Sequence, residues 1–214
     1  MLSKKRPLPS IEMRTPDRRK RSVHAKDVNC DQYTADVLDR VTALPSVETV
    51  IIWGRWALAT EGTRAPNELG DDAQLAVRGQ DVSGIADNEA LVRAGLDQLV
   101  QALRNAGVEV ILLGGTPEIG RIVPDVVLAY GTDIPSDAIP TRADIIQRNA
   151  RADAILNEVA TRHDVTLISA RDTLCPDQCV IQRDGRAVYR DDDHLSGTGA
   201  KWAIGQIMSG TTQP

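Results

Sequence analysis

Three short apolar segments, each following a stretch with helical spacing, constrain the fold of this chain most strongly. Residues 47–53, 108–113 and 165–169 are rich in Val, Ile and Leu, which is typical of strands buried on both faces. Hydrophobic residues recur at helical spacing over residues 88–105 and 142–163. This alternation predicts a parallel sheet with helices on both sides, a three-layer α/β/α sandwich.

The remaining segments fit the same plan. A helical pattern covers residues 31–44, and residues 60–88 are expected to form a loop because Gly, Asp, Asn and Pro are scattered through them. Asp184-Gly185 predicts the tight turn of a hairpin, and Ser196 is a suitable N-cap for a final helix.

Charge and length indicate one domain with a basic arm. Of 214 residues, 42% are hydrophobic, enough for one core, which we place at residues 29–210. Residues 1–28 carry nine Lys and Arg against three Asp and Glu, and we expect an irregular arm there. The rest of the chain is acidic, which argues against a nucleic-acid partner. No apolar run is long enough to span a membrane, and no apolar stretch follows the basic residues as in a secretory signal.

The three cysteines leave more than one interpretation open. Cys175 and Cys179 are four residues apart and could form a disulfide, contribute half of a metal site, or remain free thiols. A metal site needs two further ligands, and no second Cys/His pair has suitable spacing. We therefore favour the disulfide, which indicates an oxidising compartment. Cys30 is then the odd cysteine, and we expect its partner to lie outside this sequence.

Asp191 and His194 are the strongest candidates for chemistry. They lie three residues apart, just before the final helix, and an acid at this spacing can orient an imidazole as a general base. A solvated acidic loop is the structural alternative. We disfavour a metal site built from Asp191, Asp192, Asp193 and His194, because consecutive residues point to alternate sides.

Other polar groups follow the first two strands. In parallel sheets, sites gather at the C-terminal ends of strands. Arg55 and Trp56 follow the first strand and could hold an anionic group or stack a sugar. Gly115, Pro117 and Glu118 follow the second and could form the wall of a pocket. Ordinary packing and a strand-ending turn are the alternatives at these positions.

Four of these motifs together resemble a known family. They are the block from Arg190 to Ala200, Arg55-Trp56-Ala57, the segment from Pro117 to Pro124, and the segment from Leu174 to Cys179. In this order they are similar to the SGNH domain at the C-terminal end of acyltransferase-3-type membrane proteins, which O-acetylate cell-surface carbohydrates such as O-antigen.

The resemblance implies a fold, a mechanism and a location. The fold would be the SGNH-hydrolase or flavodoxin-like sandwich, and Leu174–Cys179 would be a periplasmic disulfide loop. His194 would deprotonate a serine, with Asp191 as its orienting acid. The serine would carry acetyl, without a cofactor, from a donor delivered by a membrane acyltransferase domain to a carbohydrate acceptor. Arg55, Trp56, Gly115, Pro117 and Glu118 would line the substrate pocket.

The chain departs from the family in two places. No strand ends in the family's Gly-Asp-Ser-His, and Gly115-Thr116-Pro117 stands where an oxyanion-hole Asn block is expected. The missing strand would lie inside the sheet. We therefore expect a C-terminal fragment that is inactive and marginally stable alone. Two alternatives are a non-catalytic glycan- or partner-binding module using Arg55 and Trp56, and an esterase whose nucleophile is Ser169.

Overall fold

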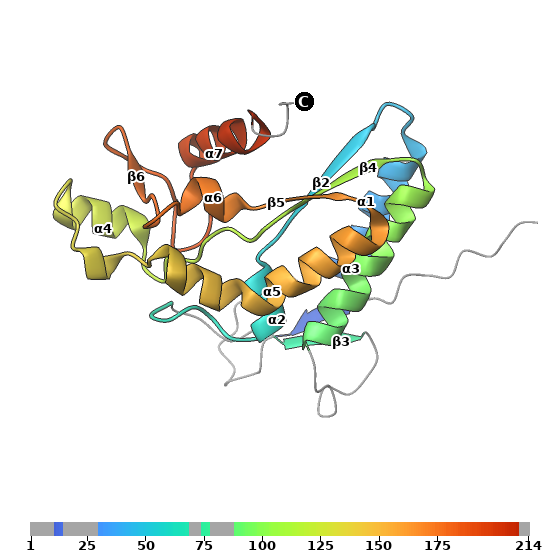
Figure 1. The fold of residues 1–214 in the computed structure, drawn as a ribbon, viewed down its shortest axis with the longest axis horizontal. Helices are drawn as coiled ribbons and strands as arrows, with labels where there is room; N and C mark the ends of the chain where they lie inside the picture. The colour runs from blue at the N-terminus through green and yellow to red at the C-terminus, as the bar shows by residue number, and fades with distance from the viewer. Residues whose placement is uncertain (1–10, 15–29, 69–73, 78–87, 210–214) are drawn as a thin grey trace, which may run out of the picture.

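The computed structural model describes residues 11–14, 30–68, 74–77 and 88–209 (Figure 1). Its strands are β1 (Ile11–Arg14), β2 (Thr49–Trp53), β3 (Gln74–Val77), β4 (Glu109–Leu113), β5 (Thr166–Ile168), β6 (Gln182–Arg183) and β7 (Arg186–Ala187). Its α-helices are α1 (Cys30–Ala43), α2 (Trp56–Glu61), α3 (Asn88–Asn105), α4 (Val123–Tyr130), α5 (Arg142–His163), α6 (Ala170–Leu174) and α7 (Gly197–Ser209), and Ser136–Ala138 form a 3₁₀ turn.

The centre of the fold is a parallel sheet in the order β2-β4-β5. Thr49 of β2 lies opposite Glu109 of β4, and Leu113 of β4 lies opposite Ile168 of β5. All three strands point the same way, so the residues that follow them are brought to one edge of the sheet. Two antiparallel pairs, β1-β3 and β6-β7, complete the described strands.

Helices cover both faces of β4, the central strand. Val110 and Leu112 are buried in a core with residues of α1, α3 and the C-terminal half of α5. Ile111 and Leu113 are buried in a second core with residues of α4, α6 and α7. In Figure 1, α3 and α5 lie on one side of the sheet and α7 on the other. The predicted parallel sheet between two helical layers is therefore confirmed.

The long helices match their sequence patterns closely. Both α3 and α5 have the bounds expected from hydrophobic spacing. Thr141 and Asp144 form a capping box at the start of α5, which satisfies backbone N–H groups that have no partner within the helix. Ser196 caps α7 as predicted, since its Oγ accepts a hydrogen bond from the N–H of Gly199 at 3.0 Å.

The short elements differ from the prediction. β1 lies within residues 1–28, expected to be irregular, and β3 lies within residues 60–88, expected to be a loop. The two strands pair with each other across about sixty residues, with Ile11 opposite Val77. Whether each segment forms a strand therefore depends on a partner far away in the chain, and the local sequence does not contain that information. The domain boundary at residue 28 stays a prediction.

One edge of the parallel sheet has no described neighbour. Within the described strands, β2 pairs only with β4. Ile51 of β2 is 43% exposed, whereas Ile111, the residue paired with it on β4, is 7% exposed. The helical layer that buries Ile111 therefore leaves Ile51 largely uncovered. Within the described residues, every helix is too short or too polar to cross a membrane.

Candidate functional site

Asp191 shapes the loop that carries the histidine. Its Oδ1 accepts hydrogen bonds from the backbone N–H groups of Asp193, at 3.1 Å, and His194, at 2.7 Å. Such bonds from a short acidic side chain to the following backbone fix a tight turn. The N–H of Arg190 also donates to the carbonyl of His194, which closes the loop at its base.

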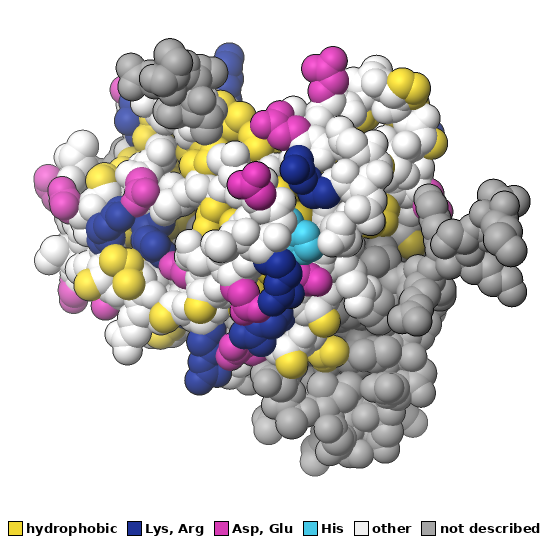
Figure 2. Space-filling view, turned by 45° about the vertical axis from the view of Figure 1, so that its right-hand side comes forward, with side chains coloured by type: hydrophobic (Ala, Val, Ile, Leu, Met, Phe, Trp, Pro, Cys, Tyr) yellow, Lys and Arg dark blue, Asp and Glu magenta, His cyan; other side chains and the backbone are white. Residues whose placement is uncertain are grey.

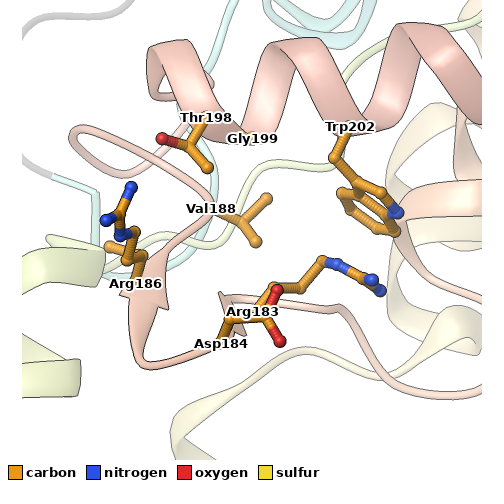
Figure 3. Close-up of a pocket in the computed structure, with 8 residues that line it drawn as sticks. Arg183, Asp184, Arg186, Val188, Thr198, Gly199 and Trp202 are labelled. Atoms are coloured by element: carbon orange, nitrogen blue, oxygen red, sulfur yellow. The ribbon is translucent and has the colours of Figure 1, made fainter.

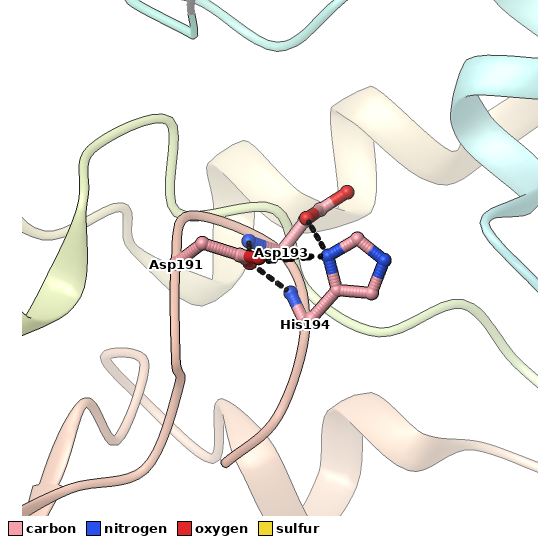
Figure 4. A group of neighbouring side chains, drawn as sticks. All are labelled: Asp191, Asp193 and His194. Atoms are coloured by element: carbon pink, nitrogen blue, oxygen red, sulfur yellow. Dashed lines mark hydrogen bonds and ion pairs between the residues drawn. The ribbon is translucent and has the colours of Figure 1, made fainter. Parts of the chain in front are cut away.

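The His194 ring faces two carboxylates through one nitrogen. Nδ1 lies 2.7 Å from Oδ1 of Asp193, and 3.0 Å and 3.2 Å from the two oxygens of Asp191. Figure 4 shows Nε2 on the opposite side of the ring, directed away from both acids. Nε2 makes no hydrogen bond within the described part of the chain. A ring bonded through Nδ1 with Nε2 free is the arrangement of a general base.

A network of buried charges supports this loop from the protein interior. Arg55 pairs through Nη1 with Oδ2 of Asp193 at 2.7 Å, and its Nε donates to Glu118 at 2.6 Å. Arg55 also contacts Glu68, and Arg148 donates to the other oxygen of Glu118. Glu68 and Glu118 are each 1% exposed at the side chain. Buried carboxylates of this kind are tolerated only when they are paired with cations, as both of these glutamates are.

The two acids beside the histidine have opposite pKa shifts. Burial raises the pKa of Asp193 to about 6, although Arg55 and His194 act in the opposite direction. For Asp191, burial would raise the pKa, but the backbone N–H groups of His194 and Asp193 outweigh it and lower the pKa to about 2. Asp191 is therefore a firmly ionised acid, while Asp193 takes up a proton in mildly acidic solution.

The predicted pocket residues lie beside this loop, but most have structural partners. Arg55 and Glu118 belong to the ion-pair network, and Pro117 is fully buried. Trp56 donates its indole N–H to the carbonyl of Leu113 at 2.8 Å. A Cβ added at Gly115 would lie 2.9 Å from the side chain of Asn149, so the backbone approaches α5 closely there. Their role in holding a substrate stays a prediction.

Sequence reasoning missed three members of the site: Asp193, Glu68 and Arg148. The sequence pattern distinguishes Asp193 only as one of several consecutive acids. The others lie on a loop and on α5, where nothing local distinguishes them from solvated charges. These residues are recognised only by their ion pairs with residues distant in the chain, and the sequence pattern does not contain that information.

The cysteines and serines also have defined places. Cys175 and Cys179 are joined by a disulfide at the end of α6. Ser196 donates its hydroxyl to the carbonyl of Ala187 and accepts from α7, so its Oγ is occupied. Ser169 follows β5 and precedes α6, at the same sheet edge as the histidine loop.

The same three side chains could also meet a cation. Ligand atoms of Asp191, Asp193 and His194 lie within 4.8 Å of one another. Arg55 already neutralises Asp193, however, and Nδ1 already contacts both acids. This donor set suits an oriented imidazole better than an ion, and the expectation of no metal stays a prediction.

A separate pocket lies between the β6-β7 hairpin and α7 (Figure 3). Its volume is about 330 Å³, and Val188 and Thr198 form part of its wall. The guanidinium of Arg183 lies over the ring of Trp202, with its Cζ 4.5 Å from the ring centroid.

Figure 2 shows that acidic and basic side chains are interspersed on the face in view, with hydrophobic side chains between them.

A parallel α/β sandwich with an acid-oriented histidine at the sheet edge defines a hydrolase-like domain. More specifically, the chain belongs to the family described as SGNH domain (fused to AT3 domains), which matches residues 6–209. The resemblance inferred from the motifs is thus confirmed. No curated protein matches the chain. Among solved structures, a candidate acylhydrolase from Bacteroides fragilis is similar, with a TM-score of 0.40 and 13% identity over 83% of this chain and 68% of that one.

Proposed function

We propose that this domain takes part in O-acetyl transfer to carbohydrate, or in the hydrolysis of acetyl esters, and supplies the acid–base half of the site. The observation that carries the proposal is His194, held through Nδ1 by carboxylates, with Nε2 left free to take a proton. Asp191 and His194 are the residues we assign to this chemistry. The family's association with AT3 domains supports an acyl donor supplied by a membrane acyltransferase domain. We further propose a periplasmic setting and no cofactor.

We propose that the serine nucleophile comes from a strand outside this sequence, paired with the free edge of β2. Three observations support this placement. β2 lacks a second neighbour within the described strands, and Ile51 is largely exposed. Nε1 of Trp53, the last residue of β2, is buried and has no hydrogen-bond partner within the described residues. An added strand ending beside Arg55 would cover this side and place its last residue near the histidine loop.

A fusion protein tests both parts of the proposal. An apolar strand ending in Gly-Asp-Ser-His would be joined to the chain through a flexible linker, and hydrolysis of 4-nitrophenyl acetate would be measured. We expect activity in the fusion that falls by about 10⁶-fold in kcat, to the uncatalysed level, in His194→Ala and in the Ser→Ala control. Equal activity in the unfused chain, or a rate unchanged by His194→Ala, would overturn the proposal.

Glycan binding without catalysis is a second candidate, favoured by the pocket in Figure 3. Trp202 offers an aromatic face, and neither Arg183 nor Arg186 pairs with a described carboxylate, which suits an acidic saccharide. Arg55 and Trp56, the contacts first expected for such a module, are engaged elsewhere. Titration with an oligogalacturonate would show binding that fails in Trp202→Ala and survives in His194→Ala.

A further inference from the structure

A second pocket opens beside the loop that carries the histidine. Its volume is about 410 Å³, and it shares no lining residue with the pocket in Figure 3. Three separate segments form its walls: the loop after α2, the residues that lead into α4, and the histidine loop itself. Its lining includes Asn67, Glu68, Arg121, Ile122, Asp125 and Asp192.

Backbone contacts hold these three walls together. The N–H of Ile119 donates to the carbonyl of Asp192 at 2.8 Å, which joins the segment before α4 to the histidine loop. On the other side, a Cβ added at Gly120 would lie 2.2 Å from the carbonyl oxygen of Pro66, so the two segments touch through their backbones. Gly120 also has a φ of +70°, which glycine adopts without strain. The shape of the pocket is therefore fixed by the backbone.

The charged groups of the pocket are mostly available to a ligand. Glu68 is already neutralised by two arginines. In contrast, the side chains of Arg121, Asp125 and Asp192 make no hydrogen bond or ion pair within the described residues. The pocket therefore presents two free carboxylates and one free guanidinium. The pocket in Figure 3 has the opposite balance, with two arginines and one aspartate in its lining.

These groups suit the hydroxyls and the C–H face of an uncharged sugar. A carboxylate accepts hydrogen bonds from hydroxyl groups through both of its oxygens, and a guanidinium donates to hydroxyl oxygens. Ile122 is 43% exposed and supplies an apolar contact for the face of the ring. An acidic sugar would bring its carboxylate close to Asp125 and Asp192, and like charges repel.

We propose that this pocket binds the sugar residue that accepts the acyl group, and that its two free carboxylates select an uncharged sugar over an acidic one. The inference rests on the proposed function, because the accepting hydroxyl has to reach the imidazole of His194. Asp192 and His194 are two residues apart, so their Cα atoms are separated by at most about 7 Å. A sugar held against Asp192 therefore lies beside the loop that carries the imidazole.

The reaction of a sugar in this position moves the acyl group from one oxygen to another. The sugar hydroxyl gives its proton to Nε2 of His194 and bonds to the acyl carbon, and the bond from that carbon to the serine oxygen breaks. The proton then passes from Nε2 to the serine oxygen. The step consumes no oxidant or reductant, and it leaves both the histidine and the serine as they were before acylation.

The test is a titration of the complete 214-residue chain with methyl glycosides, followed by ¹H–¹⁵N NMR. The methyl glycosides of glucose, galactose and mannose are each compared with the corresponding uronide, which has a carboxylate in place of the C6 hydroxymethyl group. We expect at least one neutral glycoside to shift the backbone amides of Arg121, Ile122 and Asp192. We expect its uronide to bind there about tenfold more weakly, because of charge repulsion.

Two aspartate variants separate the pocket from general surface charge. Asp125→Asn removes one free carboxylate of the lining. Asp133→Asn is the matched control, because Asp133 is exposed just beyond the end of the same helix and does not line the pocket. We expect Asp125→Asn to weaken binding of the neutral glycoside about fivefold and to narrow its advantage over the uronide, whereas Asp133→Asn changes neither. If Asp125→Asn does not fold, Asp192→Asn serves instead.

Three results would overturn the inference: no neutral glycoside shifts these amides, a uronide binds here as tightly as its neutral partner, or the lining and control variants behave alike. Shifts confined to Thr198, Gly199 and Trp202 would place the sugar in the pocket of Figure 3 and also overturn it. Binding needs no turnover. Selective binding here with an inactive serine fusion would therefore sink only the proposed function, and an active fusion without binding here would sink only this inference.

Discussion

Asp193 and Asp191 differ by two positions in the chain but experience different surroundings. Asp193 is enclosed beside Arg55, while Asp191 receives backbone N–H groups at the surface. The pKa of Asp193 is accordingly raised to about 6, and that of Asp191 is lowered to about 2. The two acids therefore contribute to stability in opposite directions as pH changes.

The sign for Asp193 gives a prediction. An aspartate with a raised pKa binds its proton more tightly in the folded state, so its contribution to the free energy of unfolding falls as pH rises from about 4 to about 6. We expect the wild type to show this decline relative to Asp193→Asn, which cannot titrate. Urea denaturation at a series of pH values measures the free energy of unfolding of both proteins. If this free energy changes with pH in the same way in both, the raised pKa of Asp193 is contradicted.

The sequence pattern identified the pair Asp191 and His194, but not the contacts that Asp193 makes with His194 and Arg55. Asp191 and His194 were found because an acid three residues before a histidine is a local pattern. Arg55 and Asp193 meet only because β2 and the histidine loop end at the same sheet edge. That contact depends on the fold, so no local pattern could have revealed it.

At the scale of elements, the close contact between α7 and the chain before it depends on Gly199. A Cβ added there would lie 2.0 Å from the carbonyl oxygen of Val188, so the backbone would have to move. We expect Gly199→Ala to lower the free energy of unfolding by about 1–3 kcal/mol.

Gly205 provides the control in the same helix, since nothing lies within 4 Å of its added Cβ. Gly205→Ala should stabilise the protein by about 0.5–1 kcal/mol, because alanine has the higher helix propensity. Chemical denaturation of both variants measures the difference. Equal changes would mean that α7 does not pack as described.

Element length decides what the sequence could reveal. α3 and α5 span several turns, so their hydrophobic spacing is unambiguous. α2, α4 and α6 have eight residues or fewer, too short for a period to stand out, and were not predicted. The apolar strands were found by composition, but their lateral order is set by packing between helices rather than by any strand alone.

At the scale of the whole molecule, the exposed side of β2 should govern association. Ile51 is exposed on this edge strand, and lysine at such positions opposes edge pairing. We expect Ile51→Lys to reduce self-association in sedimentation velocity at micromolar concentrations. Leu128→Lys is the control, because Leu128 is 87% exposed but lies on α4. Equal effects of the two variants would show that general hydrophobicity, not the sheet edge, drives association.

We propose that this domain provides the histidine and its acids, while the serine belongs to a strand beside β2. Fluorophosphonate labelling, with the labelled residue mapped by mass spectrometry, tests it most directly in the unfused chain and in the fusion with Gly-Asp-Ser-His. We expect label only on the added serine, and only when His194 is present. Label on Ser169 of the unfused chain that disappears in His194→Ala would contradict it.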